Sequence, residues 1–270
     1  MNLSDRGQTK LRNLLFRGTS WNPSTIYIGL SLDDPTQDGT GINEPSGDGY
    51  ARYSYDPGAA RWTALSTIDG HSDNSQAVTF TADGGSWGEL AYVFLAEEIS
   101  GHETMFAYKA LPVTRTINDE DSITFPVGSV DTTFGGDLSD YGQTRLRNML
   151  FRGQNWNPST MYIGFSLTDP LQSCLGITEP SVGDYARHLY SPGATNWSAA
   201  SATDGFSDNN VAVTFTADGD DWGELLYMFL AEQATGNGTV FAYKELPIPR
   251  TILDEDSVTF PISSISGTFA

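Results

Sequence analysis

The chain has 270 residues, a net charge of −20 and aromatic side chains at 12% of its positions. Nucleic acids and anionic membrane surfaces attract proteins through an excess of Lys and Arg, so this acidic chain excludes both as main partners. The aromatic content excludes a disordered acidic segment. The single cysteine, Cys174, excludes a disulfide within the chain and a cysteine metal site.

The sequence repeats itself from end to end. Shifted by half its length, it aligns with itself without a gap, and about three in five positions are identical. The stretch LFRGTSWNPSTIYIGLS at 15–31 returns as LFRGQNWNPSTMYIGFS at 150–166. We therefore expect two tandem homologous domains, residues 1–135 and 136–270, each long enough to bury its own core.

Each repeat is expected to open with a short helix. Ser4 is a natural N-cap and Gly18 a stop signal, and leucines at helical spacing lie between them. The same pattern runs from Ser139 to Gly153 in the second repeat.

The rest of each repeat is typical of β-structure. Short segments rich in apolar residues are separated by turns rich in Gly, Pro and Asp. In the first repeat the expected strands are residues 25–32, 50–55, 76–82, 89–97, 104–111 and 122–130. No βαβ rhythm appears, so the predicted fold class is mainly β, with two antiparallel β-sandwich or jelly-roll-like domains.

Histidines, the usual acid–base residues of enzymes, do not recur between the repeats. The three histidines and the residues that replace them in the other repeat are His71 and Phe206, His102 and Asn237, His188 and Tyr53. The consecutive acids at 119–121, which recur at 254–256, are predicted to form a solvated turn because adjacent side chains cannot flank a substrate. We predict no enzymatic activity, no catalytic residue and no cofactor.

The segment DGHSDN at 69–74 returns as DGFSDN at 204–209. Oxygen ligands beside a glycine turn can hold calcium. The spacing departs from the calcium-loop pattern, because the glycine comes too early and the closing Glu is missing. An Asx-rich turn is favoured, and calcium is the lesser alternative, with the candidate ligands Asp69, Asp73, Asn74, Asp204, Asp208 and Asn209.

Basic residues are few, and several gather on the two expected helices: Arg6, Lys10, Arg12, Arg17, Arg145, Arg147 and Arg152. In an acidic protein they can pair with its own carboxylates, or they can mark where the helices dock on a partner. Both interpretations are open.

All six tryptophans recur between the repeats: Trp21, Trp62 and Trp87 match Trp156, Trp197 and Trp222. We favour packing in a core or an interface. Exposed aromatics that stack on sugar rings are the alternative.

The order of the motifs resembles a family of small tailed-phage virion proteins. A helix ending in LFRG is followed by PSTIYIGLS, EPSGDGYAR, VTFTADGGSWGELAYVFL and DEDSITFPVGS. Members carry tail-fibre labels or look like capsid decoration proteins, and the family implies no enzyme. This chain departs from the pattern by an insertion, DPGAARWTALSTIDGHSDN, at 56–74.

The resemblance implies a structural protein of a tailed-phage virion. We expect a capsid decoration (cement) protein that binds the major capsid protein or another virion protein. Two linked units raise the effective concentration of each other's contacts. We also expect a homo-oligomer, such as a trimer, made in the host cytoplasm because MNLSDRGQTK lacks a signal-peptide core. The alternative is a tail or baseplate adsorption protein that binds host glycan; a glycan-cleaving enzyme is disfavoured.

Overall fold

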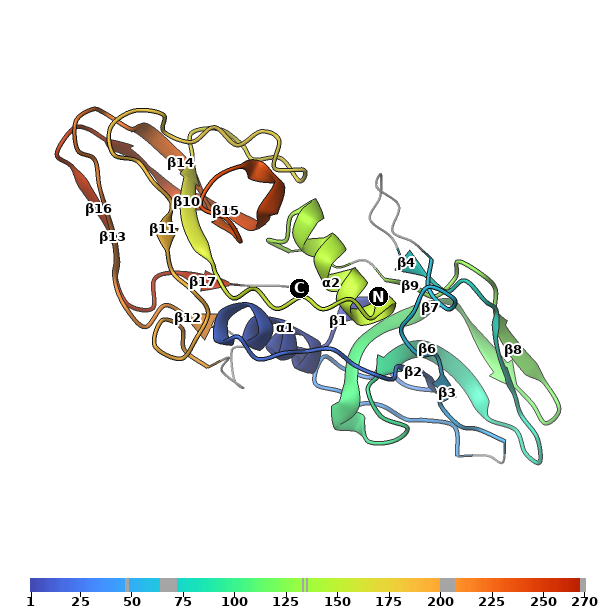
Figure 1. Ribbon diagram of the computed structural model, residues 1–270. Coiled ribbons are helices and arrows are strands. Elements are labelled where there is room, and N and C mark those ends of the chain that lie inside the picture. Colours follow the sequence, from blue (N-terminus) through green and yellow to red (C-terminus); the bar gives the residue numbers. More distant parts are fainter. Residues whose placement is uncertain (47–48, 64–71, 133, 135, 200–206, 268–270) are drawn as a thin grey trace.

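The computed structural model describes residues 1–46, 49–63, 72–132, 134, 136–199 and 207–267. It is mainly β, and each repeat begins with one helix, as predicted (Figure 1). The elements of the first repeat are β1 (Asn2–Leu3), α1 (Asp5–Arg17), β2 (Tyr27–Ser31), β3 (Tyr53–Ser54), β4 (Ser72–Asp73), β5 (Val78–Thr81), β6 (Gly88–Ala96), η1 (His102–Thr104), β7 (Met105–Ile117), β8 (Ser122–Phe125) and β9 (Asp131–Thr132). Those of the second repeat are α2 (Asp140–Arg152), β10 (Tyr162–Ser166), β11 (His188–Leu189), β12 (Ser207–Asp208), β13 (Val213–Thr216), β14 (Gly223–Ala231), η2 (Asn237–Thr239), β15 (Val240–Ile252), β16 (Ser257–Phe260) and β17 (Ser266–Gly267).

The main sheet of each repeat is antiparallel. Its strand order is β1-β7-β6-β2-β3 in the first repeat and β11-β10-β14-β15 in the second. Leu138 forms a bridge with Ala242 where β1 pairs with β7 in the first repeat, so the two sheets have equivalent strands. Two-stranded pairs accompany each sheet: β5–β8 and β4–β9, then β13–β16 and β12–β17. The antiparallel, mainly β prediction is confirmed.

Each helix lies directly on the long strand of its own sheet. The side chain of Ser4 caps α1 by accepting a hydrogen bond from the Gly7 amide at 3.2 Å, and Gly18 ends it at φ 66°. A Cβ at Gly7 would lie 2.3 Å from the carbonyl oxygen of Phe106 in β7, so only glycine allows this approach. Gly142 has the same close contact in the second repeat.

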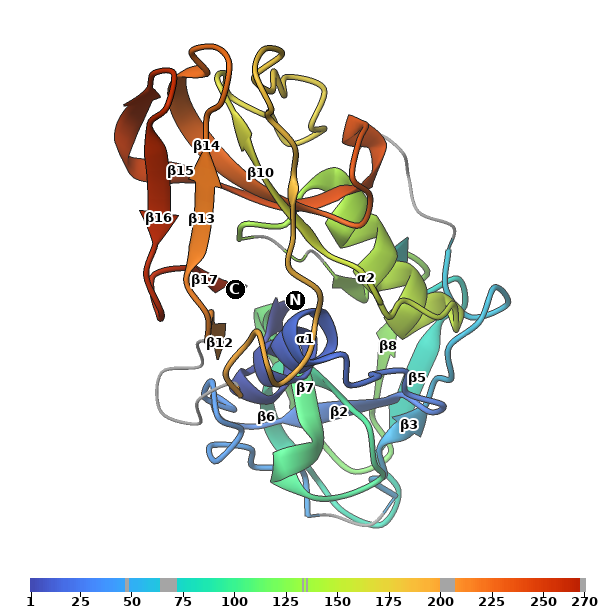
Figure 2. The same cartoon turned by 60° about the vertical axis from the view of Figure 1, so that its left-hand side comes forward.

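The two repeats pack on each other through the ends of these helices, which lie between the two β-lobes (Figures 1 and 2). The ring of Phe16, in α1, lies on Trp197 of the second repeat, with ring centroids 4.4 Å apart. The ring of Phe151, in α2, lies on Trp62 of the first repeat at the same 4.4 Å. Each helix end therefore fills part of the other repeat's core.

Polar contacts follow the same reciprocal rule. Nη1 of Arg17 donates to the carbonyl oxygen of Trp197 at 2.7 Å, and Nη1 of Arg152 donates to that of Trp62, also at 2.7 Å. The carbonyl oxygens of the two helix-end phenylalanines each accept a backbone N–H of the other repeat at 2.8 Å. Equal distances in both directions give an approximate two-fold relation, the geometry of an isologous dimer within one chain.

One continuous cluster of buried side chains includes residues from both repeats, Phe16 and Trp197 among them. The helix stripe predicted from the leucine spacing contributes to it, and Leu11, Leu14 and Leu15 are fully buried. The sequence-based boundary between two separate domains at 135 and 136 stays a prediction.

Candidate functional site

The described histidines and the cysteine lie on different elements: His102 in η1, His188 in β11 and Cys174 in the loop after β10. His102 is exposed in η1, and His71 lies outside the described residues. His188 is half-buried against the ring of Phe215, and burial lowers its pKa. Cys174 is buried, which raises its pKa to about 11. A thiol in that environment is unreactive at neutral pH.

The consecutive acids form a solvent-exposed turn. The carboxylate of Asp119 accepts the Gly84 amide at 2.9 Å, and that of Asp121 accepts the Asn118 amide at 3.0 Å. Both acids are exposed. They satisfy backbone donors of the turn and agree with the solvated-turn interpretation.

A buried asparagine is the structural centre of each turn offered as a calcium site. Nδ2 of Asn74 donates to the carbonyls of Gln76 and Pro126 at 2.8 and 2.9 Å, and Oδ1 accepts the Val130 amide at 2.8 Å. Asn209 makes the equivalent three bonds. Both asparagines are fully buried, and their amides join neighbouring segments of the chain.

The remaining candidate calcium ligands are only partly described. Asp69 and Asp204 lie outside the described residues, while Asp73 and Asp208 belong to the short strands β4 and β12. Across the described ranges, no group of three or more His, Cys, Asp or Glu residues could hold a metal ion. Calcium binding at these turns stays a prediction.

Three basic residues in the first half of the helices pair with a carboxylate of their own repeat. Arg6 and Lys10 lie 2.5 and 3.6 Å from Glu97, and Arg145 lies 3.7 Å from Glu232. Their side chains are about one-third exposed, at 32%, 38% and 37%. Ion pairs with this exposure contribute at most about 1 kcal/mol each.

The other four basic residues donate hydrogen bonds to groups within the protein. Arg12 and Arg147 are buried, and each donates to a glutamine one turn earlier on its helix, at 2.7 and 2.8 Å. Arg17 and Arg152 make the contacts between repeats described above. All seven residues therefore have partners within the chain. Docking of the helices on another protein stays a prediction.

All six tryptophans are buried, with exposures of 0 to 4%. Trp62 and Trp197 pack between the repeats, and Nε1 of Trp21 donates to Glu97 at 2.6 Å. The core and interface interpretation agrees with these positions. No tryptophan ring lies open for stacking on a sugar.

A small polar pocket of about 200 Å³ lies beside Trp156 and Glu232. The carboxylate of Glu232 already accepts hydrogen bonds from Nε1 of Trp156 and from the hydroxyl of Tyr141. The carboxylate of Glu232 is therefore engaged within the protein.

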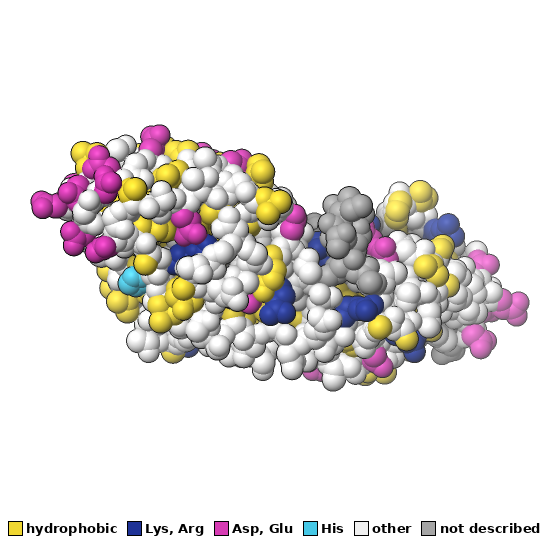
Figure 3. Space-filling model, turned by 45° about the horizontal axis from the view of Figure 1, so that its top comes forward, with side chains coloured by type: hydrophobic (Ala, Val, Ile, Leu, Met, Phe, Trp, Pro, Cys, Tyr) yellow, Lys and Arg dark blue, Asp and Glu magenta, His cyan; other side chains and the backbone are white. Residues whose placement is uncertain are grey.

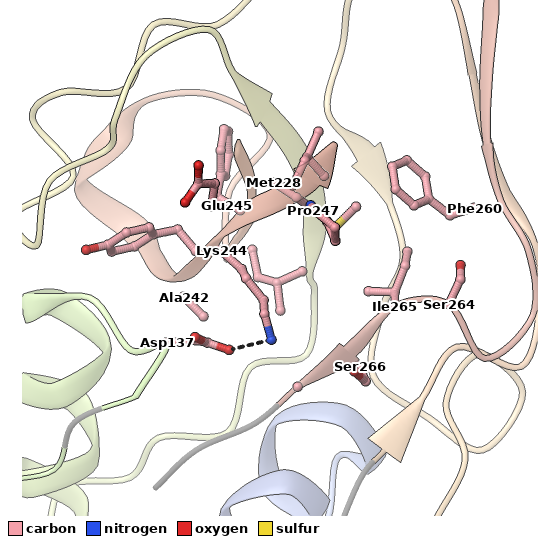
Figure 4. A pocket seen from close by; sticks show the side chains of 15 residues that line it. Asp137, Met228, Ala242, Lys244, Glu245, Pro247, Phe260, Ser264, Ile265 and Ser266 are labelled. Carbon is pink, nitrogen blue, oxygen red and sulfur yellow. Dashed lines mark ion pairs between the residues drawn. The ribbon is translucent and has the colours of Figure 1, made fainter. Parts of the chain in front are cut away.

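A larger pocket of about 230 Å³ opens in the second repeat, beside the inner face of β14 and β15 (Figure 4). Met228, Leu230 and Ala242 line it from the sheet, and Phe260 and Ile265 line it from the opposite side. These side chains make it chiefly apolar, the usual character of a binding cavity.

One ion pair lies at this pocket. Nζ of Lys244 is 3.6 Å from the Asp137 carboxylate (Figure 4). Lys244 is 56% exposed, so the pair borders solvent. The pocket therefore combines an apolar interior with a charged edge.

None of the residues that line this pocket is among the candidate site residues predicted from the sequence. A signal was present, because aligned repeats place Met1 opposite Gly136. A large apolar residue lost from one copy leaves space in that copy. The position of that space, however, is known only when the strands that surround it are placed.

The surface is chemically uneven. Asp and Glu gather at the two far ends of the face in Figure 3, and Lys and Arg lie toward its middle. The described part of the chain contains no helix with the length and apolarity needed to span a membrane. Among the residues that the structure describes, exposed large aliphatic side chains are more numerous in the second repeat: Ile99, Val113 and Val127 in the first, and Leu171, Leu175, Val182, Leu189, Val211, Ile248, Leu253 and Ile262 in the second.

Comparison with known proteins identifies one family. The family described as podophage GP4 fiber I protein gp80 matches residues 2–133 and matches again over residues 137–268. No curated protein matches the chain. The two matches cover nearly the whole chain and confirm the resemblance to phage virion proteins and the tandem duplication.

Proposed function

The chain belongs to the family of the podophage GP4 fiber I protein gp80, and on that premise we propose that it is a non-catalytic structural protein that works by binding other virion proteins. The family indicates a fibre-type virion component.

The observation that carries the proposal is the twofold match to this family in a chain whose repeats share a core. The reciprocal helix contacts hold two equivalent β-lobes in a defined relation. Two equivalent lobes in one chain suit attachment to a structure built from repeated subunits, because the second contact becomes intramolecular. The absence of a recurring histidine supports a role without catalysis.

The fibre is the placement that we propose first, because the family description names it. Protein partners are favoured over host sugars, since the six tryptophans are buried and offer no stacking platform.

Capsid decoration, expected from the sequence, is the second placement. The longest described helix and strand each have 13 residues, so the described residues form a short, lobed body without a shaft. Such a body fits a cement protein that adds interface across capsid subunits. A homo-oligomer, such as a trimer, belongs to the same proposal.

Copy number in purified particles tests the proposal. Quantitative mass spectrometry of this chain against the major capsid protein, together with cryo-electron microscopy, counts and locates it. A small number of copies at the tail supports the fibre, and copies in proportion to the capsid protein support decoration. If purified particles lack the chain, the structural role itself is wrong.

A further inference from the structure

The apolar pocket of the second repeat occupies a place that the first repeat fills with its own chain. Aligned repeats put Met1 where the second repeat has Gly136. The next residues, Asn2 and Asp137, lie equivalently beside the long strands β7 and β15. Met1 therefore serves as an internal template for what this space accommodates.

The contacts of Met1 place it over the surface of the first repeat that corresponds to the pocket lining in the second repeat. Its amino nitrogen donates to the carbonyl oxygen of Asp131 at 3.0 Å, and the matching residue in the second repeat, Ser266, lines the pocket. Met1 is only 4% exposed and belongs to the continuous buried cluster. Gly136 has no side chain to do the same.

The size and chemistry of the pocket suit one apolar side chain. Its volume of about 230 Å³ exceeds the roughly 150 Å³ of cavities that bind a benzene-sized molecule. Its interior is formed by aliphatic and aromatic groups, Met228, Ile265 and Phe260 among them. A methionine- or leucine-sized group would be surrounded by apolar atoms.

Exposed aliphatic residues stand next to the pocket lining in sequence. Ile248 follows the lining residue Pro247 and is 68% exposed, and Ile262 lies between the lining residues Phe260 and Ser264 and is 61% exposed. An apolar pocket with apolar neighbours is a common feature of protein-binding sites, because a central anchor and its surroundings exclude water together.

We propose that this pocket is a docking site for one methionine- or leucine-sized side chain, presented by an extended segment of a neighbouring virion protein. The inference rests on the proposed function and deepens it by naming the attachment point. It assigns this apolar contact to the second repeat, because the first repeat has filled the equivalent space with Met1. The ion pair of Lys244 and Asp137 offers polar groups to the backbone of the incoming segment.

Filling the pocket tests the proposal. Ala242→Leu adds volume from the sheet, and Ser266→Leu adds it from β17 on the opposite side. Each purified variant is added to phage particles assembled without this chain, and bound copies are measured against protein concentration. We expect an affinity about tenfold to a hundredfold below that of the unaltered protein, the loss that follows when one apolar anchor is excluded.

Matched changes in the first repeat are the controls. Ala107→Leu alters the equivalent of Ala242 in the repeat that Met1 already covers, and Ala107 is fully buried, so it should lower the urea midpoint while Ala242→Leu does not. Ile248→Ser should weaken particle binding at least about threefold, whereas Val113→Ser, its equally exposed counterpart, should not. This surface pair decides the matter if either filling variant fails to fold.

The outcomes separate the two levels of the proposal. If the unaltered protein does not bind the depleted particles, the proposed function fails. If it binds, and the folded filling variants and Ile248→Ser bind equally well, the pocket assignment is wrong while the function stands. Self-association in sedimentation that Ser266→Leu abolishes would make the occupant a second copy of this chain, which also overturns the assignment.

Discussion

Replacing Trp197 with alanine should destabilise the whole molecule and not one repeat alone. Its ring is fully buried between Phe16 of the other repeat and Tyr190 of its own, at centroid distances of 4.4 and 5.1 Å. Because the buried cluster is continuous, the cavity left by Trp197→Ala opens in the contact that joins the repeats.

The magnitude follows from the buried area. A buried tryptophan removes up to about 250 Å² from water, which at about 25 cal/mol per Å² corresponds to about 6 kcal/mol. Residual compaction of the unfolded chain lowers that figure. Measured losses for Trp→Ala in cores are about 3–5 kcal/mol, and we expect a value in that range.

Urea unfolding followed by circular dichroism and by fluorescence is the assay. We expect one cooperative transition for the unaltered protein, with both signals coincident, and a lower midpoint at unchanged slope for Trp197→Ala. Trp62→Ala, the reciprocal change, should cost the same within about 1 kcal/mol because its contact has the same geometry. Trp21→Ala, whose ring packs on Phe106 within one repeat, provides the comparison for a tryptophan away from the contact.

Two separate transitions, of which Trp197→Ala shifts only one, would refute the reasoning. So would a cost below about 1 kcal/mol, since a fully buried ring in a shared core cannot be removed so cheaply.

Three further predictions concern single residues. Asn74→Ala should lower the free energy of unfolding by about 2–4 kcal/mol in urea titrations, because three hydrogen bonds of a buried amide are lost; a loss below about 1 kcal/mol would contradict that role. Burial lowers the pKa of His188 in the folded protein. As the pH falls below about 6.5, the unfolded chain therefore binds more protons than the folded protein, and the free energy of unfolding should decrease. His188→Tyr, which copies Tyr53 of the first repeat, should flatten that dependence in thermal melts from pH 5 to 8; an unchanged slope would exclude His188 as its source. Cys174, with its pKa raised to about 11, should resist a thiol reagent at pH 8 in the folded protein and react in urea; fast labelling of the folded protein would show an accessible thiol.

Several local features could be predicted because they depend on near neighbours in the chain. The helix follows from the Ser4 cap, the leucine spacing and Gly18, and the structure begins and ends it at those signals. Strand limits were less accurate. The strand expected over 104–111 extends to Ile117, because Pro112 falls in the irregular stretch between the paired residues Ala110 and Arg115 and interrupts no ladder bond.

The basic residues of the helices show why the candidate site was harder to predict. The sequence placed Arg17 among the basic residues of the expected helix and left open whether it pairs within the chain or with a partner. The structure shows it donating to Trp197, which is 180 positions away in the chain. No local pattern encodes a contact at that separation.

From the sequence alone come the duplication, the acidic charge, the capped helices and the alternation of apolar residues in strands, since each is a property of composition or short-range spacing. Only the tertiary structure decided that each helix end packs into the other repeat and that the place of Met1 is a pocket in the second copy. The physical reason is that burial depends on the atoms brought around a side chain by distant segments. Two nearly identical sequences can therefore fold alike and still present different surfaces.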